Sequence, residues 1–360
     1  MKFTVSQSEL NRAMQFVASA IDGKSTLPVM SNVLITADAD SITLSGTNGE
    51  LEKLITISAD VKEHGETTVP AKKMTDFAKN ADPSKDVTLE LKNAKASIKS
   101  GRAKWQLNTL PAKEYPEFMS IDESESIECD IALLVDAVKR CSPTMANNDT
   151  RYYLNGMLFD IDGTTMTVVA TDGHRMNFYE MPISESQPRQ IIIPRASVND
   201  IVKMISKGSE ASIVIGKDNI KVSVDGMVMY SKLVDGRYPD YKRVVPSDCP
   251  VTATINTEEF RSSVRRTIPI TTKINNGILF GFAGDSLTIS ATNEVSEQGT
   301  ESMPCHISGG SMEIGFNGAY VMDALSSINE ENTTINMSNS SSSVIINEGP
   351  FSAVLMPVRF

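Results

Sequence analysis

The spacing of hydrophobic residues alternates between two periods along the chain. Residues 7–21 repeat apolar side chains every three or four positions behind a capping box from Ser6 to Glu9, which predicts an amphipathic helix. Residues 41–47 alternate apolar and polar side chains instead, as a half-buried strand does. The helical period recurs at five more places. These further predicted helices cover 71–80, 130–141, 195–207, 257–267 and 318–328.

A short motif recurs three times. It reads Ser-Ile-Thr-Leu-Ser-Gly-Thr-Asn at 41–48, Thr-Met-Thr-Val-Val-Ala-Thr-Asp at 165–172 and Ser-Leu-Thr-Ile-Ser-Ala-Thr-Asn at 286–293. A second marker leads into a predicted helix in each copy, at 69–76, 193–200 and 316–323. Both markers keep the same order and a spacing of roughly 120 residues, which is the size of a small domain.

Each repeat shows the same order of predicted elements: a strand, a helix, alternating strands, a second helix and more strands. Turn signals such as Asp162-Gly163 and Gly284-Asp285 favour antiparallel pairing. Two helices with several antiparallel strands make an α+β domain. Polar stretches at 121–127 and 246–250 mark the boundaries. We therefore predict three tandem, similar domains at 1–124, 125–247 and 248–360.

The composition excludes several classes of protein. The 360 residues carry a formal net charge of −11 and 40% are hydrophobic, which suits packed domains and excludes a wholly basic nucleic-acid coat. No apolar run reaches the roughly 18 residues of a membrane-spanning helix, and the opening residues lack the apolar core of a signal peptide. The four cysteines show no paired CxxC spacing. We expect a cytoplasmic protein with reduced thiols.

The charge is divided unevenly between the predicted elements. The six predicted helices hold twelve basic and eight acidic residues, so the strands and loops carry the whole negative excess. Ordinary solvated helix faces would give such a pattern. A layered protein that presents basic helices to a polyanion, and an acidic layer elsewhere, would give it too.

Candidate motifs for catalysis and nucleotide binding are weak. His174 lies near Asp172, but no nucleophile-elbow sequence accompanies the pair, and a turn explains it as well. Residues 23–26, Gly-Lys-Ser-Thr, match the end of a phosphate-binding loop, yet Ala18 stands where that loop requires glycine. We predict no catalytic residue, no metal and no cofactor.

Several longer runs of sequence resemble one family. They lie at 1–5, 26–28, 151–157, 170–175, 231–241 and 356–360. Over the whole chain they make it similar to the bacterial DNA sliding clamp, the beta subunit of DNA polymerase III. The resemblance implies a DNA clamp fold in which two three-domain chains join head to tail into a ring. Helices would line the hole and strands would form the outer layer.

The resemblance also implies a function. The ring would encircle double-stranded DNA without reading its sequence and would confer processivity on the replicative polymerase. Expected partners are a second copy of the chain, the DNA polymerase III alpha subunit, the clamp-loader complex, and other DNA polymerases and repair proteins with short clamp-binding peptides.

The resemblance assigns candidate residues to two sites. Residues expected to contact DNA are Lys24, Lys72, Lys73, Asn148, Arg151, Tyr152, Tyr153 and Arg195. Residues expected to form a partner-peptide groove between the second and third domains are Leu154, Thr171, Gly173, His174, Arg175, Met176, Pro239, Arg243, Val244, Asn317, Tyr320, Val354, Met356, Pro357 and Val358. Arg175 and Arg243 are expected to orient the polar end of the peptide. Val358 replaces a methionine that is common in the family.

A third candidate site is the contact between subunits. The resemblance places Trp105 and its strand against the start of the third repeat, where Pro269 follows Ile268. Basic residues of one copy would face acidic residues of the other. The residues expected at this interface are Arg102, Lys104, Trp105, Leu107, Ile268, Glu294, Glu297 and Glu301.

Two other classes of function stay open from the residues alone. One is an enzyme with triplicated domains, which the absence of a nucleophile motif, metal cluster or phosphate loop argues against. The other is a protein-interaction scaffold that never encloses DNA. A catalytic screen of His174→Ala would discriminate the first, and retention on nicked circular DNA that is lost after linearisation would discriminate the second. The oligomeric mass in solution is the single most informative observation.

Overall fold

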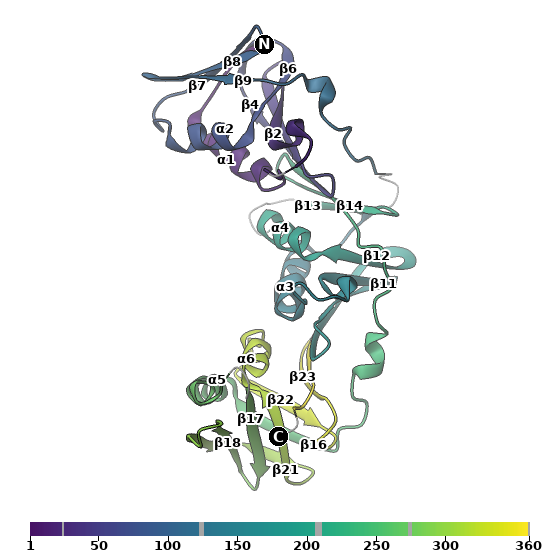
Figure 1. Ribbon diagram of the computed structural model, residues 1–360. Helices are drawn as coiled ribbons and strands as arrows, with labels where there is room; N and C mark the ends of the chain where they lie inside the picture. The colour runs from purple at the N-terminus through teal and green to yellow at the C-terminus, as the bar shows by residue number, and fades with distance from the viewer. Residues whose placement is uncertain (24, 122–125, 206–210, 273–275, 359–360) are drawn as a thin grey trace. The chain divides into compact units, whose positions relative to one another are not determined.

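The computed structural model describes residues 1–23, 25–121, 126–205, 211–272 and 276–358 (Figure 1). Its contacts fall into two compact units. Unit 1 holds Met1–Glu128 and Asn199–Leu233, and unit 2 holds Cys129–Val198 and Val234–Phe360. The predicted domain limits therefore differ from these units, because strands and helices of the middle repeat join one unit or the other.

Unit 1 contains two antiparallel sheets. In the smaller sheet the strand order is β5 (Asp60–Glu63), β1 (Lys2–Val5), β7 (Val87–Lys92), β8 (Lys95–Ser100) and β9 (Ala103–Asn108). In the larger sheet it is β10 (Ser126–Ile127), β13 (Ala211–Ile215), β14 (Asn219–Val224), β15 (Met227–Lys232), β4 (Leu51–Ser58), β3 (Ser41–Thr47), β2 (Asn32–Asp38) and β6 (Gly65–Pro70).

Unit 2 also contains two antiparallel sheets. The larger has the order β11 (Gly156–Thr171), β12 (Arg175–Pro194), β24 (Phe351–Leu355), β23 (Val344–Glu348), β22 (Asn332–Met337), β16 (Val251–Asn256) and β20 (His306–Ser308). The smaller has the order β19 (Gln298–Pro304), β18 (Ser286–Thr292), β17 (Gly277–Ala283) and β21 (Met312–Asn317). Every pairing between the described strands is antiparallel, so the α+β prediction is confirmed.

The described ranges contain six α-helices. They are α1 (Gln7–Ala18), α2 (Ala71–Asn80), α3 (Ile131–Cys141), α4 (Arg195–Ile205), α5 (Thr257–Thr267) and α6 (Gly318–Ser326). Figure 1 shows α1 beside α2 in unit 1, and α5 beside α6 in unit 2. The apolar faces of α1 and α2 close the core of unit 1 with Phe3, Ile42 and Leu89.

Local signals in the sequence explain where helices begin. The Ser6 hydroxyl accepts a hydrogen bond from the Glu9 amide, as the capping box predicts. The carboxylate of Asp130 and the side-chain carbonyl of Asn256 cap α3 and α5 in the same way. Helix α1 ends at Ala18, three residues before the predicted end.

One local prediction is wrong. Asp162-Gly163 does not end a strand, because β11 continues through it and absorbs Gly163 (φ 61°) as an irregularity in the pairing with β12. The final strand stops at Leu355, so Met356 lies outside it. The predicted turn at Gly284-Asp285 does connect the neighbouring strands β17 and β18.

Strand pairing joins the sequence repeats. Strand β15 from the second repeat pairs with β4 from the first, and Met229 lies opposite Lys53. Strand β24 from the third repeat pairs with β12 from the second, and Val354 lies opposite Met176. This second seam brings together the residues of the candidate site.

Candidate functional site

A cavity of about 200 Å³ opens in unit 2 beside the β12–β24 seam. Four separate segments of the chain supply its walls. Nine of the expected groove residues line it: Leu154, Thr171, Gly173, Arg175, Met176, Pro239, Val244, Val354 and Met356. The lining also includes Arg151, Asp240 and Tyr241, which sequence reasoning did not assign to this site.

The cavity has an apolar floor and a partly exposed apolar rim. Leu154, Met176 and Val354 form the floor and are almost fully buried. At the rim the side chains of Val244 and Met356 are 42% and 44% exposed. Large solvent-exposed apolar groups indicate an interaction surface, because their burial under an apolar partner lowers the free energy.

The turn between β11 and β12 forms one wall. The Asp172 carboxylate accepts hydrogen bonds from the amides of His174 (2.9 Å) and Arg175 (3.1 Å), and the Gly173 amide donates to the Thr171 hydroxyl. Gly173 has a φ of 88°, which favours glycine. A Cβ there would lie 2.8 Å from Nη1 of Arg151, so glycine also makes room for this arginine.

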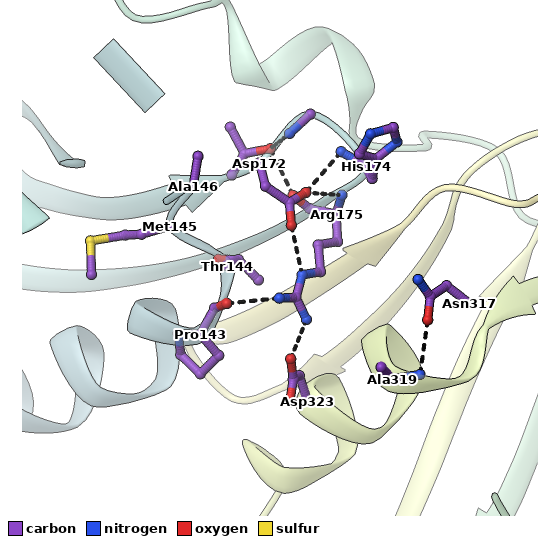
Figure 2. Close-up of polar contacts among 12 residues, drawn as sticks. Pro143, Thr144, Met145, Ala146, Asp172, His174, Arg175, Asn317, Ala319 and Asp323 are labelled. Atoms are coloured by element: carbon purple, nitrogen blue, oxygen red, sulfur yellow. Dashed lines mark hydrogen bonds and ion pairs between the residues drawn. The ribbon is translucent and has the colours of Figure 1, made fainter. Parts of the chain in front are cut away.

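Arg175 is held inside the protein. Its Nε donates to Asp172 (3.0 Å), its Nη2 donates to the Pro143 carbonyl (2.9 Å), and its Nη1 donates to Asp323 (Figure 2). The side chain is 11% exposed. Each of the three guanidinium nitrogens has an acceptor within the protein, and Arg175 also lines the cavity, so its role toward a partner's polar end stays a prediction.

The other expected groove residues lie around the cavity without lining it. His174 stacks on Tyr320, with ring centroids 6.3 Å apart. Asn317 caps α6, and the Val358 amide donates to the Gly315 carbonyl. Pro357 is half-buried beyond Met356. Arg243 is 83% exposed, pairs with Asp240 at 2.8 Å and lines a neighbouring pocket with Tyr153 and Arg237.

The residues expected to contact DNA differ in whether their side chains are free in solvent or bonded within the protein. Lys72 and Lys73 on α2, Asn148 and Tyr152 are exposed, and Tyr153 meets Tyr152 edge to face. Arg195 instead donates to the carbonyls of Met145 (2.6 Å) and Ala146 (3.2 Å). Arg151 pairs with Asp149, which lowers the pKa of that carboxyl to about 2. Lys24 lies outside the described residues.

The excess of helix cations overstates the charge that a DNA partner would meet. Arg140 is buried between Glu348 and the Phe351 ring, and Arg261 donates to carbonyls at the end of α6. Arg266 pairs with Glu301 at 2.7 Å. The exposed helix cations include Lys72, Lys73, Lys79, Lys139 and Arg265.

The expected interface residues lie along two sheet edges. Strand β9 is the last strand of its sheet, and the Trp105 ring there is 40% exposed and packs edge-on against Phe77. Arg102 and Lys104 are exposed beside it, whereas Leu107 is buried.

Strand β19 is the edge strand of the smaller sheet in unit 2. Glu301 on it already pairs with Arg266, and Glu297 and Glu294 accept hydrogen bonds from Asn293 and Thr272. Ile268 and Pro269 form a single 3₁₀ turn nearby, η7 (Ile268–Ile270).

Two features of the described residues bear on other functions. No group of three or more His, Cys, Asp or Glu side chains within them is placed to hold a metal ion. None of the helices in the described ranges is long and apolar enough to cross a membrane.

Comparison with known proteins gives matches over the full length. Three family models match in order: the N-terminal domain of the DNA polymerase III beta subunit at residues 1–119, its central domain at 128–240 and its C-terminal domain at 242–359. The beta sliding clamps of Vibrio cholerae serotype O1 and Escherichia coli K12 are each 33% identical over 365 residues, covering 100% of both chains.

Solved structures agree with these matches. The DNA polymerase III subunit beta from Pseudomonas aeruginosa superposes with a TM-score of 0.94 at 32% identity, and Caulobacter crescentus pol III beta with 0.92 at 26%. Each covers 100% of this chain and of its own. The sequence repeat therefore corresponds to three tandem clamp domains.

Proposed function

Because this chain belongs to the family of DNA polymerase III beta subunits, the beta sliding clamps, we propose that two copies close head to tail around duplex DNA. The closed ring holds DNA by enclosure, so it needs no contact with base edges. It tethers the replicative polymerase and performs no chemistry of its own. A clamp loader opens and closes it.

Two uncovered sheet edges support the ring. Strands β9 and β19 are each the last strand of a sheet, and they are similar in length. An edge strand presents unpaired backbone amides and carbonyls that a strand from another chain can pair with. Pairing of β9 from one copy with β19 from its partner would cover Trp105 and bring Arg102 and Lys104 toward the acidic residues near β19.

Exposed helix cations support the contact with DNA. Lys72 and Lys73 on α2 extend into solvent, as Lys139 on α3 does. Lysine supplies a point charge that attracts phosphates whatever the base sequence. The net charge of −11 on the whole chain opposes binding elsewhere on the surface.

The cavity in unit 2 supports the tether to partners, and it is the observation that carries this part of the proposal. A partner inserts a short peptide whose apolar anchors cover Leu154, Val244 and Met356. Each buried apolar side chain contributes about 1.5–3 kcal/mol. Two anchors and a few hydrogen bonds then give roughly micromolar affinity, so the polymerase, other polymerases and repair proteins can exchange on one ring.

Retention on circular DNA tests the proposal. The clamp is loaded onto nicked circular plasmid with a clamp loader and ATP, and free protein is removed by gel filtration. We expect the clamp to stay on the circle and to be released after a single restriction cut. Equal retention on circular and linear DNA would contradict enclosure.

A further inference from the structure

Helix α6 contacts the groove wall through two side chains one turn apart. Tyr320 and Asp323 share a face of α6 because residues three apart are neighbours on a helix. The Tyr320 ring lies 4.3 Å from the guanidinium carbon of Arg175 and stacks on His174. Asp323 accepts a hydrogen bond from Arg175 Nη1 (Figure 2).

The interaction continues from Arg175 into the turn. One oxygen of Asp172 receives Arg175 Nε, and the other receives the amides of His174 and Arg175. Asp172 therefore serves both as the acceptor for the guanidinium and as the cap of the turn. The Met356 amide donates to the His174 carbonyl, so the same turn also fixes a rim residue of the cavity.

Removal of Asp323 would leave Nη1 of an arginine that is 11% exposed without its carboxylate. A mostly buried guanidinium is held less strongly by a neutral acceptor than by a carboxylate, and it relieves the loss of the counter-charge by moving toward water. Because Arg175 and Asp172 are joined, such a movement disturbs the turn and with it the cavity wall.

We propose that Asp323 is a positioning residue for the peptide groove: through Arg175 it fixes the 172–175 turn, so that peptide binding is linked to the docking of α6. This inference rests on the proposed peptide-binding function of the cavity. Linkage is reciprocal, so a bound peptide in turn strengthens the interaction between α6 and the turn.

The test compares Asp323→Asn with the intact protein. A fluorescein-labelled peptide from the cognate DNA polymerase III alpha subunit is titrated with full-length clamp, and its anisotropy gives Kd. We expect Asp323→Asn to raise Kd by about tenfold. Asp323→Glu, which keeps the carboxylate, should restore most of the affinity. The matched control is Asp76→Asn, which alters a carboxylate on α2 in unit 1, far along the chain from the cavity segments.

Two further measurements separate positioning from general damage. Hydrogen exchange should become faster at residues 171–178 in Asp323→Asn and stay unchanged in unit 1. In a double-mutant cycle, Asp323→Asn should add almost nothing to Arg175→Ala, because both act through one ion pair.

If the intact clamp does not bind the peptide, the proposed function fails and this inference fails with it. If the intact clamp binds, but Asp323→Asn leaves Kd and exchange unchanged, only the positioning role is overturned. Additive effects of Asp323→Asn and Arg175→Ala would also overturn it.

Discussion

The Lys53 ammonium on β4 lies 2.7 Å from the Asp200 carboxylate on α4, and the lysine side chain is only 2% exposed. Lys53 also donates to the Ser19 hydroxyl and lies over the Phe16 ring. Burial lowers the pKa of Lys53, which the hydrogen bond with Asp200 partly offsets. A buried ion pair therefore connects the first sequence repeat to the second within unit 1.

Removing the two partners of this pair should have unequal effects. Asp200→Asn leaves a buried ammonium without its counter-charge and should destabilise unit 1 by about 3 kcal/mol. Lys53→Met removes the charge itself and should cost much less. Urea unfolding followed by the fluorescence of Trp105, the single tryptophan of the chain, reports on this unit. Equal destabilisation in both variants would show that charge burial is not the cause.

Trp105→Asp should convert the dimer into monomers. A charge placed in an apolar interface between subunits gives up its hydration without gaining a partner. Sedimentation at low micromolar protein gives the mass. Leu27→Asp is the matched control, because Leu27 is also exposed in the first repeat but is not expected at the interface. A dimeric Trp105→Asp protein would place the interface elsewhere.

Reversing two exposed helix charges should weaken DNA binding in a salt-dependent way. For Lys72→Glu with Lys73→Glu, we expect the slope of log K against log salt to fall by about 0.9 for each phosphate that is no longer neutralised. Lys95→Glu with Lys113→Glu changes the same number of exposed lysines outside the α-helices and should leave the slope unchanged. Equal slopes for both pairs would mean that α2 does not face DNA.

Val244→Asp should abolish most peptide binding without affecting the dimer. The substitution places a carboxylate at the apolar rim and removes an anchoring interaction of about 1.5–3 kcal/mol, which corresponds to roughly 10- to 100-fold in Kd. Peptide anisotropy and sedimentation measure the two properties on the same sample. Leu27→Asp, at an exposed site far along the chain from the cavity segments and outside the expected interface, is the control. Unchanged affinity in Val244→Asp would remove Val244 from the groove.

Local features were readable from the sequence because neighbouring residues decide them. Ser6, Asp130 and Asn256 begin helices as expected, since each supplies a side-chain oxygen to an amide two or three residues on. The nine cavity residues were assigned by family resemblance, and no periodicity in the chain would have selected them.

Long-range features were not readable in this way. The sequence does not say which sheet a strand joins, so the pairing of β15 with β4 and of β12 with β24 went unpredicted. It also does not say whether a cation points outward. Arg140, Arg175 and Arg195 all look like surface charges in the sequence, yet each has its acceptors inside unit 2. Asp323 was missed because the sequence does not show that it pairs with Arg175, which lies 148 residues earlier in the chain.

The pairing of β12 with β24 has a consequence for synthesis on the ribosome. Strand β12 ends at Pro194, and its partner begins at Phe351, roughly 160 residues later. At about 5–20 residues per second, translation leaves this edge of β12 without its final neighbour for about 8–30 s. An uncovered edge invites pairing with other nascent chains. The last strand to be made therefore completes the sheet that contains β12, a strand of the middle repeat. If the ribosome stalls before β24 is made, the released chain has an uncovered strand edge and is exposed to aggregation.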